Sequence, residues 1–152
     1  MTGWIFRILD RLRDAARRRR WNAGHSAGRT GEDLAHRRLR DLGFVIVSRN
    51  FRRRSGSAEL DLVAWEGETL VFVEVKTRGT GEFGAPDRAV DAEKQIHIAK
   101  AAREYIRRSR LAPAKVRFDI VSIVLTCPPS VELLRDAFRP PAWLSYNTRL
   151  FC

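Results

Sequence analysis

The sequence has few of the residues that define disulfide-rich and metal-ligating proteins. Its 152 residues include two cysteines, Cys127 and Cys152, and neither belongs to a C-x-x-C pair. Two isolated cysteines are too few for the disulfide framework of a small secreted domain. The three histidines, His25, His36 and His97, show no metal-ligand spacing and are expected to be incidental. These shortages exclude a disulfide scaffold and favour a reducing compartment.

Long apolar runs are also absent. No run approaches the roughly 18 residues of a membrane-spanning helix. The apolar stretch from Trp4 to Leu12 is interrupted by charged residues at positions 7, 10 and 11, which is untypical of a secretory signal peptide. By elimination, the sequence predicts a cytoplasmic protein without a transmembrane segment.

Acidic residues are scarce relative to basic ones. The chain has 18 Asp and Glu against 29 Lys and Arg, which gives a formal net charge of +11. Most of this charge is arginine, whose planar guanidinium suits phosphate. A basic protein kept soluble by its charge is the plainer alternative, and an anionic membrane surface is a third. Because the excess is large for this length, we expect a nucleic acid partner, bound through phosphate neutralisation and counterion release.

The length suits one domain with an extension at each end. Residues 1–28 are interpreted as a basic N-terminal helical extension and linker, residues 29–138 as the main domain, and residues 139–152 as an irregular tail. The apolar residues at positions 4–12 have helical spacing, and four arginines follow at positions 17–20. This segment could lie on nucleic acid or a membrane, pack on the main domain, or be a poorly ordered extension. We prefer an appended helix that contacts phosphate.

Hydrophobic periodicity and turn residues predict alternating helices and strands. The expected elements are a helix from about Thr30 to Gly43, strands over 44–48, 59–65 and 69–77, a helix from 87 or 91 to 109, a strand over 116–125, and a short helix over 131–138. The core order is α-β-β-β-α-β, and the strand over 69–77 has apolar residues on both faces. The sequence therefore predicts an α/β fold with a mixed sheet flanked by helices.

Four charged residues interrupt two of these strands. Glu59 and Asp61 lie two residues apart, as do Glu74 and Lys76, so each pair shares one face of its strand. A two-residue hairpin loop at 66–67 would place all four on the same face, with Asp61 diagonally adjacent to Glu74. A loop of odd length would send the pairs to opposite faces.

This arrangement suits metal-assisted phosphodiester hydrolysis. Asp61, Glu74 and the backbone carbonyl of Val75 can supply the oxygen ligands that a hard divalent cation such as Mg²⁺ or Mn²⁺ prefers. The metal would polarise the phosphoryl oxygen and acidify a bound water. Lys76 could orient or deprotonate that water, or stabilise charge on the phosphate. The plainer alternative is an exposed strand end at which Asp61 joins a cross-strand charge pair.

The motifs of the chain resemble those of a bacterial family. They are Thr30-Gly31-Glu32-Asp33-Leu34-Ala35, Arg49-Asn50-Phe51-Arg52, Glu59-Leu60-Asp61-Leu62-Val63-Ala64, Val71-Phe72-Val73-Glu74-Val75-Lys76-Thr77-Arg78, Phe83-Gly84-Ala85-Pro86 and Arg117-Phe118-Asp119. In this order they resemble the YraN-type family, whose members are regarded as predicted endonucleases. That family is similar to archaeal Holliday-junction resolvases of the PD-(D/E)xK superfamily. The resemblance covers roughly residues 28–138, and it departs at Ala58, where the family usually has glycine.

The resemblance implies a restriction-endonuclease-like αβββαβ core and a role for each motif residue. Asp61 and Glu74 would be metal ligands, Lys76 the catalytic lysine, and Glu32 an accessory acid. Without the resemblance, Glu32 would be interpreted as a helix-dipole acid. Because related resolvases cut paired strands symmetrically, the resemblance also implies a homodimer.

Basic and polar residues near this cluster are the expected nucleic-acid contacts. Four arginines bracket a predicted turn over 50–57, and the resemblance adds two residues of the long helix. The expected contacts are Arg49, Arg52, Arg53, Arg54, Arg78, Lys94 and Gln95. The sequence thus predicts a Mg²⁺-dependent endonuclease-like protein acting on DNA, in particular branched or structured DNA. The alternative is a non-catalytic nucleic-acid-binding or scaffold protein that retains the nuclease fold.

Overall fold

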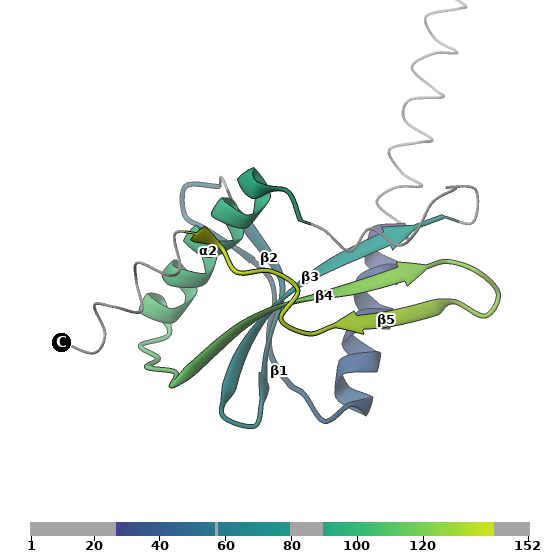
Figure 1. Ribbon diagram of the computed structural model, residues 1–152, viewed down its shortest axis with the longest axis horizontal. Coiled ribbons are helices and arrows are strands. Elements are labelled where there is room, and N and C mark those ends of the chain that lie inside the picture. Colours follow the sequence, from purple (N-terminus) through teal and green to yellow (C-terminus); the bar gives the residue numbers. More distant parts are fainter. Residues whose placement is uncertain (1–26, 57, 80–89, 142–152) are drawn as a thin grey trace, which may run out of the picture.

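The computed structural model describes residues 27–56, 58–79 and 90–141 (Figure 1). The predicted helix over the first 21 residues, most of the glycine-rich loop before the long helix and most of the C-terminal tail lie outside these ranges. Within them the chain forms a five-stranded mixed sheet with a helix on each side, which confirms the predicted α/β fold. Neither of the two long helices in these ranges combines the length and apolarity needed to cross a bilayer.

The strands follow the chain in spatial order β1-β2-β3-β4-β5. The elements are a helix over residues 27–41, β1 (Val45–Arg52), β2 (Glu59–Glu66), β3 (Thr69–Arg78), α2 (Ala92–Arg108), β4 (Lys115–Val124) and β5 (Ser130–Leu134). β3 and β4 are parallel, and every other neighbouring pair is antiparallel. A parallel pair needs a long crossover, and α2 lies in the connection between these two strands.

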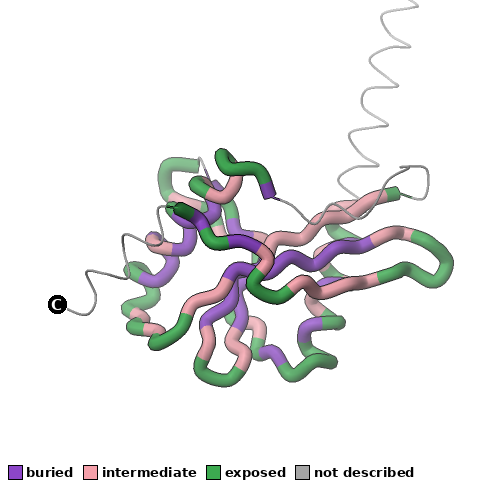
Figure 2. Tube along the Cα trace, viewed as in Figure 1, coloured by how far each residue is buried: buried purple, intermediate pink, exposed green. Residues whose placement is uncertain are grey.

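Two apolar cores lie on opposite faces of the sheet. One contains Ile98 and Ala102 of α2 packed with Phe72 and Phe118. The other contains Ala35 and Leu39 of the 27–41 helix packed with Val71, Val73 and Val121 of the sheet. The central strands are therefore covered on both sides, as their uninterrupted apolar residues predicted (Figure 2).

The first helix begins earlier than predicted. Residues 27–29 are already helical, so Thr30 lies inside the helix rather than capping it. Gly43 has φ of +88°, in the left-handed region that glycine favours, and it follows the helix as predicted.

The predicted short helix over 131–138 is wrong. Residues Ser130–Leu134 form β5, in which Val131 pairs with Ile123 and Leu133 pairs with Val121 of β4. Both apolar side chains pack against the core on the 27–41 helix side. Their period-two spacing is the spacing of a strand, so the helical interpretation missed an edge strand.

The hairpin between β2 and β3 turns one residue later than predicted. Glu66 pairs with Thr69, so the loop consists of Gly67 and Glu68, and Gly67 has φ of +58°. The pairing runs to Leu62 and Val73. Continued by one residue, this register would set Asp61 of β2 opposite Glu74 of β3 rather than diagonal to it, but the ladder ends before these two residues. The loop still has two residues, so the odd-length loop that would have sent the pairs to opposite faces does not form.

Candidate active site

Asp61 lies where β2 stops pairing with β3. Its Oδ2 accepts a hydrogen bond of 2.8 Å from the backbone N–H of Val75. In an extended strand, the N–H and C=O of one residue point to the same side. The carbonyl of Val75 therefore also faces the side of β3 on which Asp61 lies. Two of the predicted oxygen donors, a carboxylate and a backbone carbonyl, are thus directed to the same place.

Glu74 is paired with a residue of the long helix. The Nζ of Lys94 lies 3.2 Å from Oε1 of Glu74, and the Glu74 side chain is only 11% exposed. Lys94 belongs to the first turn of α2, which is fixed by a cap: its backbone N–H donates to Oδ1 of Asp91. The cap orients the start of the helix, so that Lys94 extends toward the sheet.

The surroundings of Asp61 and Lys94 raise the pKa of both groups, for different reasons. Loss of solvent, and then the charge of Glu74, raise the pKa of Asp61 to about 7, although the N–H of Val75 opposes the shift. Burial by itself lowers the pKa of Lys94, but the charge of Glu74 and its hydrogen bond outweigh burial, so the pKa of Lys94 is raised. The site thus holds two neighbouring carboxylates and one ammonium group.

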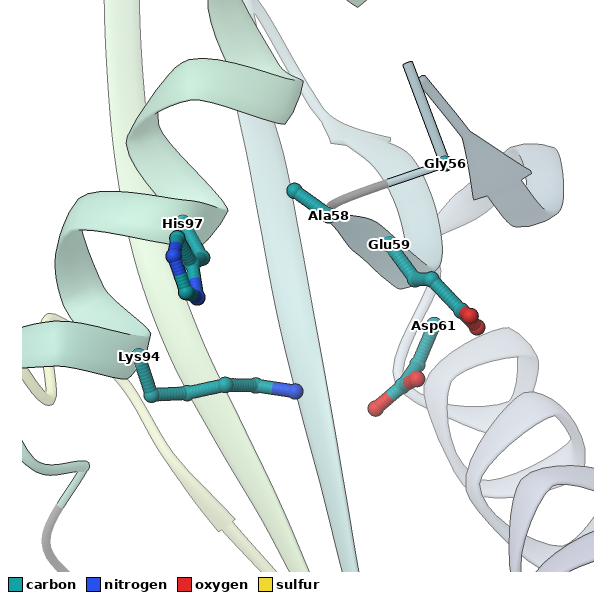
Figure 3. A pocket seen from close by; sticks show the side chains of 6 residues that line it. All are labelled: Gly56, Ala58, Glu59, Asp61, Lys94 and His97. Atoms are coloured by element: carbon teal, nitrogen blue, oxygen red, sulfur yellow. The ribbon is translucent and has the colours of Figure 1, made fainter. Parts of the chain in front are cut away.

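A cavity of about 220 Å³ opens between the start of β2 and α2 (Figure 3). Its lining residues are Gly56, Ala58, Glu59, Asp61, Lys94 and His97. Lys94 reaches from the helix toward the strand that carries Asp61, and the carboxylates of Glu59 and Asp61 form the facing wall. His97, expected to be incidental, lies on the helix side of the cavity, because it follows Lys94 by three residues and shares its helix face.

A second cavity, of about 280 Å³, lies on the other side of Asp61. Its lining residues are Ala27, Gly28, Glu32, Asp61, Val75, Thr77 and Gly79. The predicted accessory acid Glu32 therefore shares a cavity with Asp61. Oε2 of Glu32 accepts a hydrogen bond of 2.8 Å from the side-chain amide of Asn50. Asn50 has φ of +50°, a left-handed conformation that asparagine tolerates better than most residues.

The helix that carries Glu32 touches β3 through a glycine. A Cβ atom on Gly31 would lie 1.8 Å from Oγ1 and 2.9 Å from Cβ of Thr77. Only a residue without a side chain permits this approach, which brings the neighbouring Glu32 to the cavity. Gly31 and Asn50 were not singled out as site residues from the sequence. They act through contacts between elements, which sequence spacing does not specify.

Lys76 follows Glu74 by two residues on β3 and pairs in register with Ser122 of β4. Alternation places it on the same face of the strand as Glu74. It is partly buried, and neither of the two cavities is lined by it. The proximity of Lys76 to a reacting phosphate stays a prediction.

The arginines do not bracket a turn over 50–57 as predicted, because β1 continues through Arg52. Three of them are engaged in ion pairs: Arg49 with Asp33 at 2.6 Å, Arg52 with Glu59 at 3.5 Å, and Arg53 with Glu104 at 3.0 Å. The backbone N–H of Arg54 also donates to Glu104. Glu104 of α2 thereby holds the short turn before β2, and the side chains of Arg52 and Arg54 lie at the surface.

The two remaining predicted contacts occupy different settings. The side-chain amide of Gln95 donates to the carbonyl of Val90 at 2.8 Å, so it supports the segment before α2. Arg78 is the last residue of β3, and its backbone carbonyl accepts from the N–H of Leu125. A contact between either side chain and phosphate stays a prediction.

Within the described ranges, no three Asp, Glu, His or Cys side chains converge as a complete metal-binding group. Asp61 and Glu74 form a pair of carboxylates, to which the carbonyl of Val75 adds a third oxygen. Any ion held here would take its other ligands from water or from a substrate.

Comparison with known proteins places the chain in a family. The model of the uncharacterised protein family UPF0102 matches residues 31–123, which include every motif residue of the site. A UPF0102 protein of Solibacter usitatus is 51% identical over 138 residues, covering 91% of this chain and 100% of the relative. Relatives from Geobacter sulfurreducens and Rhodococcus opacus are 45% and 47% identical over 113 residues, covering 73% of this chain and 87% and 94% of theirs. This chain is a member of family UPF0102.

Proposed function

We propose that this protein is a metal-dependent endonuclease-like protein that hydrolyses phosphodiester bonds in DNA, with linear and branched or structured DNA both candidate substrates. One observation carries the proposal. Asp61 accepts a hydrogen bond from the backbone of Val75 where β2 parts from β3, and the charge of the neighbouring Glu74 acts on its carboxylate. Two carboxylates on apolar strands are costly unless something positively charged joins them.

The donor set fits Mg²⁺ or Mn²⁺. Both ions prefer oxygen, and Mg²⁺ is commonly held by one or two carboxylates together with water and substrate phosphate. The raised pKa of Asp61 is what burial and an adjacent carboxylate produce, and a cation would reverse it. A bound ion supplies Lewis-acid polarisation of the phosphoryl oxygen and increases the acidity of water.

Val75, Lys76 and Glu32 would each have a separate role beside the ion. The N–H of Val75 fixes the orientation of the Asp61 carboxylate. Lys76, on the face of Glu74, would orient the attacking water or stabilise charge that develops on the phosphate. Glu32, held by Asn50 on the other side of Asp61, would add negative charge and tune the affinity of the site for a cation.

The nucleic-acid part of the proposal rests on charge and topology. The formal net charge of +11 favours a polyanion. The element order α-β-β-β-α-β, with acidic residues at the opening between two strands, supports a relationship to the PD-(D/E)xK superfamily and its resolvases. By the same analogy the protein would act as a homodimer.

A second candidate is a non-catalytic nucleic-acid-binding protein with the same architecture. Two observations favour it. Among the described residues no three acidic, histidine or cysteine side chains converge as a complete metal-binding group, and Glu74 is already neutralised by Lys94. A protein of this kind would bind DNA and need no divalent ion.

Cleavage assays separate the two candidates. Labelled linear, single-stranded and four-way-junction DNA would be incubated with Mg²⁺ or Mn²⁺ and wild type, Asp61→Ala, Lys76→Ala or the control Lys100→Ala. Lys100 is an exposed residue of α2 outside both cavities. We expect cleavage by wild type and Lys100→Ala, and its loss in the other two with DNA binding retained. Binding without cleavage of any substrate by wild type would favour the non-catalytic candidate.

A further inference from the structure

The ammonium of Lys94 lies against the carboxylates that are proposed to hold a metal ion. It is 3.2 Å from Glu74, and the charges of Glu74, Asp61 and Glu59 all act to raise its pKa. The lysine comes from a helix, whereas the three acids come from two strands. Figure 3 shows its side chain extended across the cavity toward Asp61. The most favourable position for a cation in this cluster is therefore occupied by the chain itself.

We propose that Lys94 is the internal counter-cation of the metal-free site, and that it competes with the divalent ion for Glu74 and Asp61. Lys94 would then set the metal affinity of the site, in addition to any contact with phosphate. The inference rests on the proposed function, because it assumes that these two carboxylates hold the ion.

The sign of the effect follows from charge. A divalent ion that enters between Glu74 and Asp61 must separate Glu74 from Lys94 and accept repulsion from the displaced ammonium. The loss of the ion pair and the repulsion both weaken metal binding, and neither occurs when residue 94 is neutral. A partly buried pair is screened less by salt than a surface pair, so the effect persists in ordinary buffers.

The cavity provides a place for the displaced ammonium. Lysine has a flexible four-carbon stem, and the Lys94 side chain is 41% exposed, so it can turn without disturbing the core. The cavity of about 220 Å³ beside it is walled by His97 and Glu59. In this position the ammonium would no longer be paired with Glu74. It would face a DNA strand that approaches Asp61, and metal binding would thereby expose a phosphate-binding group.

Metal titration tests the inference without any cleavage assay. Mn²⁺ binding would be measured by calorimetry for wild type, Lys94→Gln, Lys94→Arg and the control Lys100→Gln. The titrations would be run at about pH 8, above the Asp61 pKa of about 7, and repeated at about pH 9, because the loss of Lys94 would raise that pKa further. We expect Lys94→Gln to bind Mn²⁺ about two- to tenfold more tightly than wild type, the range of a partly screened ion pair. Lys94→Arg and Lys100→Gln should resemble wild type.

The outcomes separate this inference from the proposed function. If Asp61→Asn abolishes Mn²⁺ binding but Lys94→Gln binds Mn²⁺ no more tightly than wild type, the metal site stands and the role of Lys94 is overturned. If wild type and Lys94→Gln bind no Mn²⁺ that depends on Asp61, both proposals fail.

A second measurement uses the wild-type protein and does not depend on the folding of a variant. The ¹⁵N resonances of lysine ammonium groups would be recorded during titration with Mg²⁺, and the Lys94 signal would be assigned by its absence in Lys94→Arg. We expect the Lys94 signal to shift as the ion displaces it, while the Lys100 signal stays constant. Saturation with Mg²⁺ without a shift of the Lys94 signal would overturn the inference.

Discussion

The Oδ2 atom of Asp61 accepts a hydrogen bond of 2.8 Å from the main chain of Val75, so a side chain continues the contact between β2 and β3 after their pairing has ended. The last pair of the ladder joins Leu62 to Val73. On its other side, β3 stays paired with β4 as far as Arg78. One edge of β3 is therefore held throughout, and the other is open to the site from Glu74 onward.

The first prediction concerns how much the ionised Asp61 side chain destabilises the folded protein. Because its folded pKa is raised to about 7, the folded protein keeps a proton that the unfolded chain loses near pH 4. Stability therefore falls as pH rises from about 4 to 7, and the loss is complete above about 7. We expect Asp61→Asn to raise the free energy of unfolding by about 1–3 kcal/mol at pH 8, and much less at pH 5, when urea unfolding is measured with a chelator.

Glu68→Gln is the matched control for that prediction. Glu68 is an exposed acid in the hairpin loop, so the difference from wild type should change little between the two pH values. An Asp61→Asn protein that is less stable than wild type at pH 8 would contradict the prediction.

The second prediction concerns the contact between the 27–41 helix and β3. Gly31→Ala places a methyl group 1.8 Å from Oγ1 of Thr77, so the helix or the strand must shift. We expect a loss of about 1–3 kcal/mol in the free energy of unfolding, as for other overpacked sites. Gly28→Ala meets no atom within 4 Å and should be close to neutral. In a double-mutant cycle, Thr77→Ala should recover part of the loss, and additive effects of the two substitutions would show that the contact does not matter.

The third prediction separates the two properties of Asn50. Its amide binds Glu32, and its φ of +50° favours glycine over alanine. Both Asn50→Gly and Asn50→Ala lose the hydrogen bond, but only alanine adds backbone strain of about 1 kcal/mol. We expect equal effects of the two variants on cleavage and a lower melting temperature for Asn50→Ala. Unequal cleavage at a temperature where both are folded would argue against a role through Glu32.

The fourth prediction concerns a buried ion pair on β4 that takes no part in the proposed metal site. Arg117 binds both carboxylate oxygens of Asp119 at 2.8 Å, and Asp119 has no exposed surface. Arg117→Met would leave this carboxylate buried without its cation, so we expect a loss of about 3–5 kcal/mol in the free energy of unfolding. The control is Arg139→Met at the exposed pair with Asp136, with an expected loss of less than about 1 kcal/mol. If urea unfolding gave the same loss of free energy for Arg117→Met and Arg139→Met, burial would not explain the effect.

The shared face of Asp61 and Glu74 could be predicted from sequence because strand side chains have a period of two. The hairpin loop was placed one residue too early, which changed the register by two. A shift of two residues moves a partner along the strand but does not move it to the other face. The face assignment was therefore insensitive to the error, whereas the hydrogen bond from the main chain of Val75 to Asp61 was not predicted.

Contacts between separate elements could not be predicted in this way. The bond from Asn50 to Glu32 and the approach of Gly31 to Thr77 depend on how the 27–41 helix lies on the sheet. His97 was within reach, since its three-residue spacing from Lys94 places both on one helix face. That spacing was visible in the sequence, but only the position of α2 beside β2 shows that this helix face lines the cavity.

The hydrogen bond between Val75 and Asp61 also makes one amide a natural reporter of the site. The resonance of the Val75 amide proton depends on the charge of the carboxylate that it faces, so it should follow protonation, ion binding and DNA binding at Asp61. The signal comes from the main chain and needs no label on a side chain and no substitution in the site. A single backbone resonance would thus give a continuous record of the charge at Asp61.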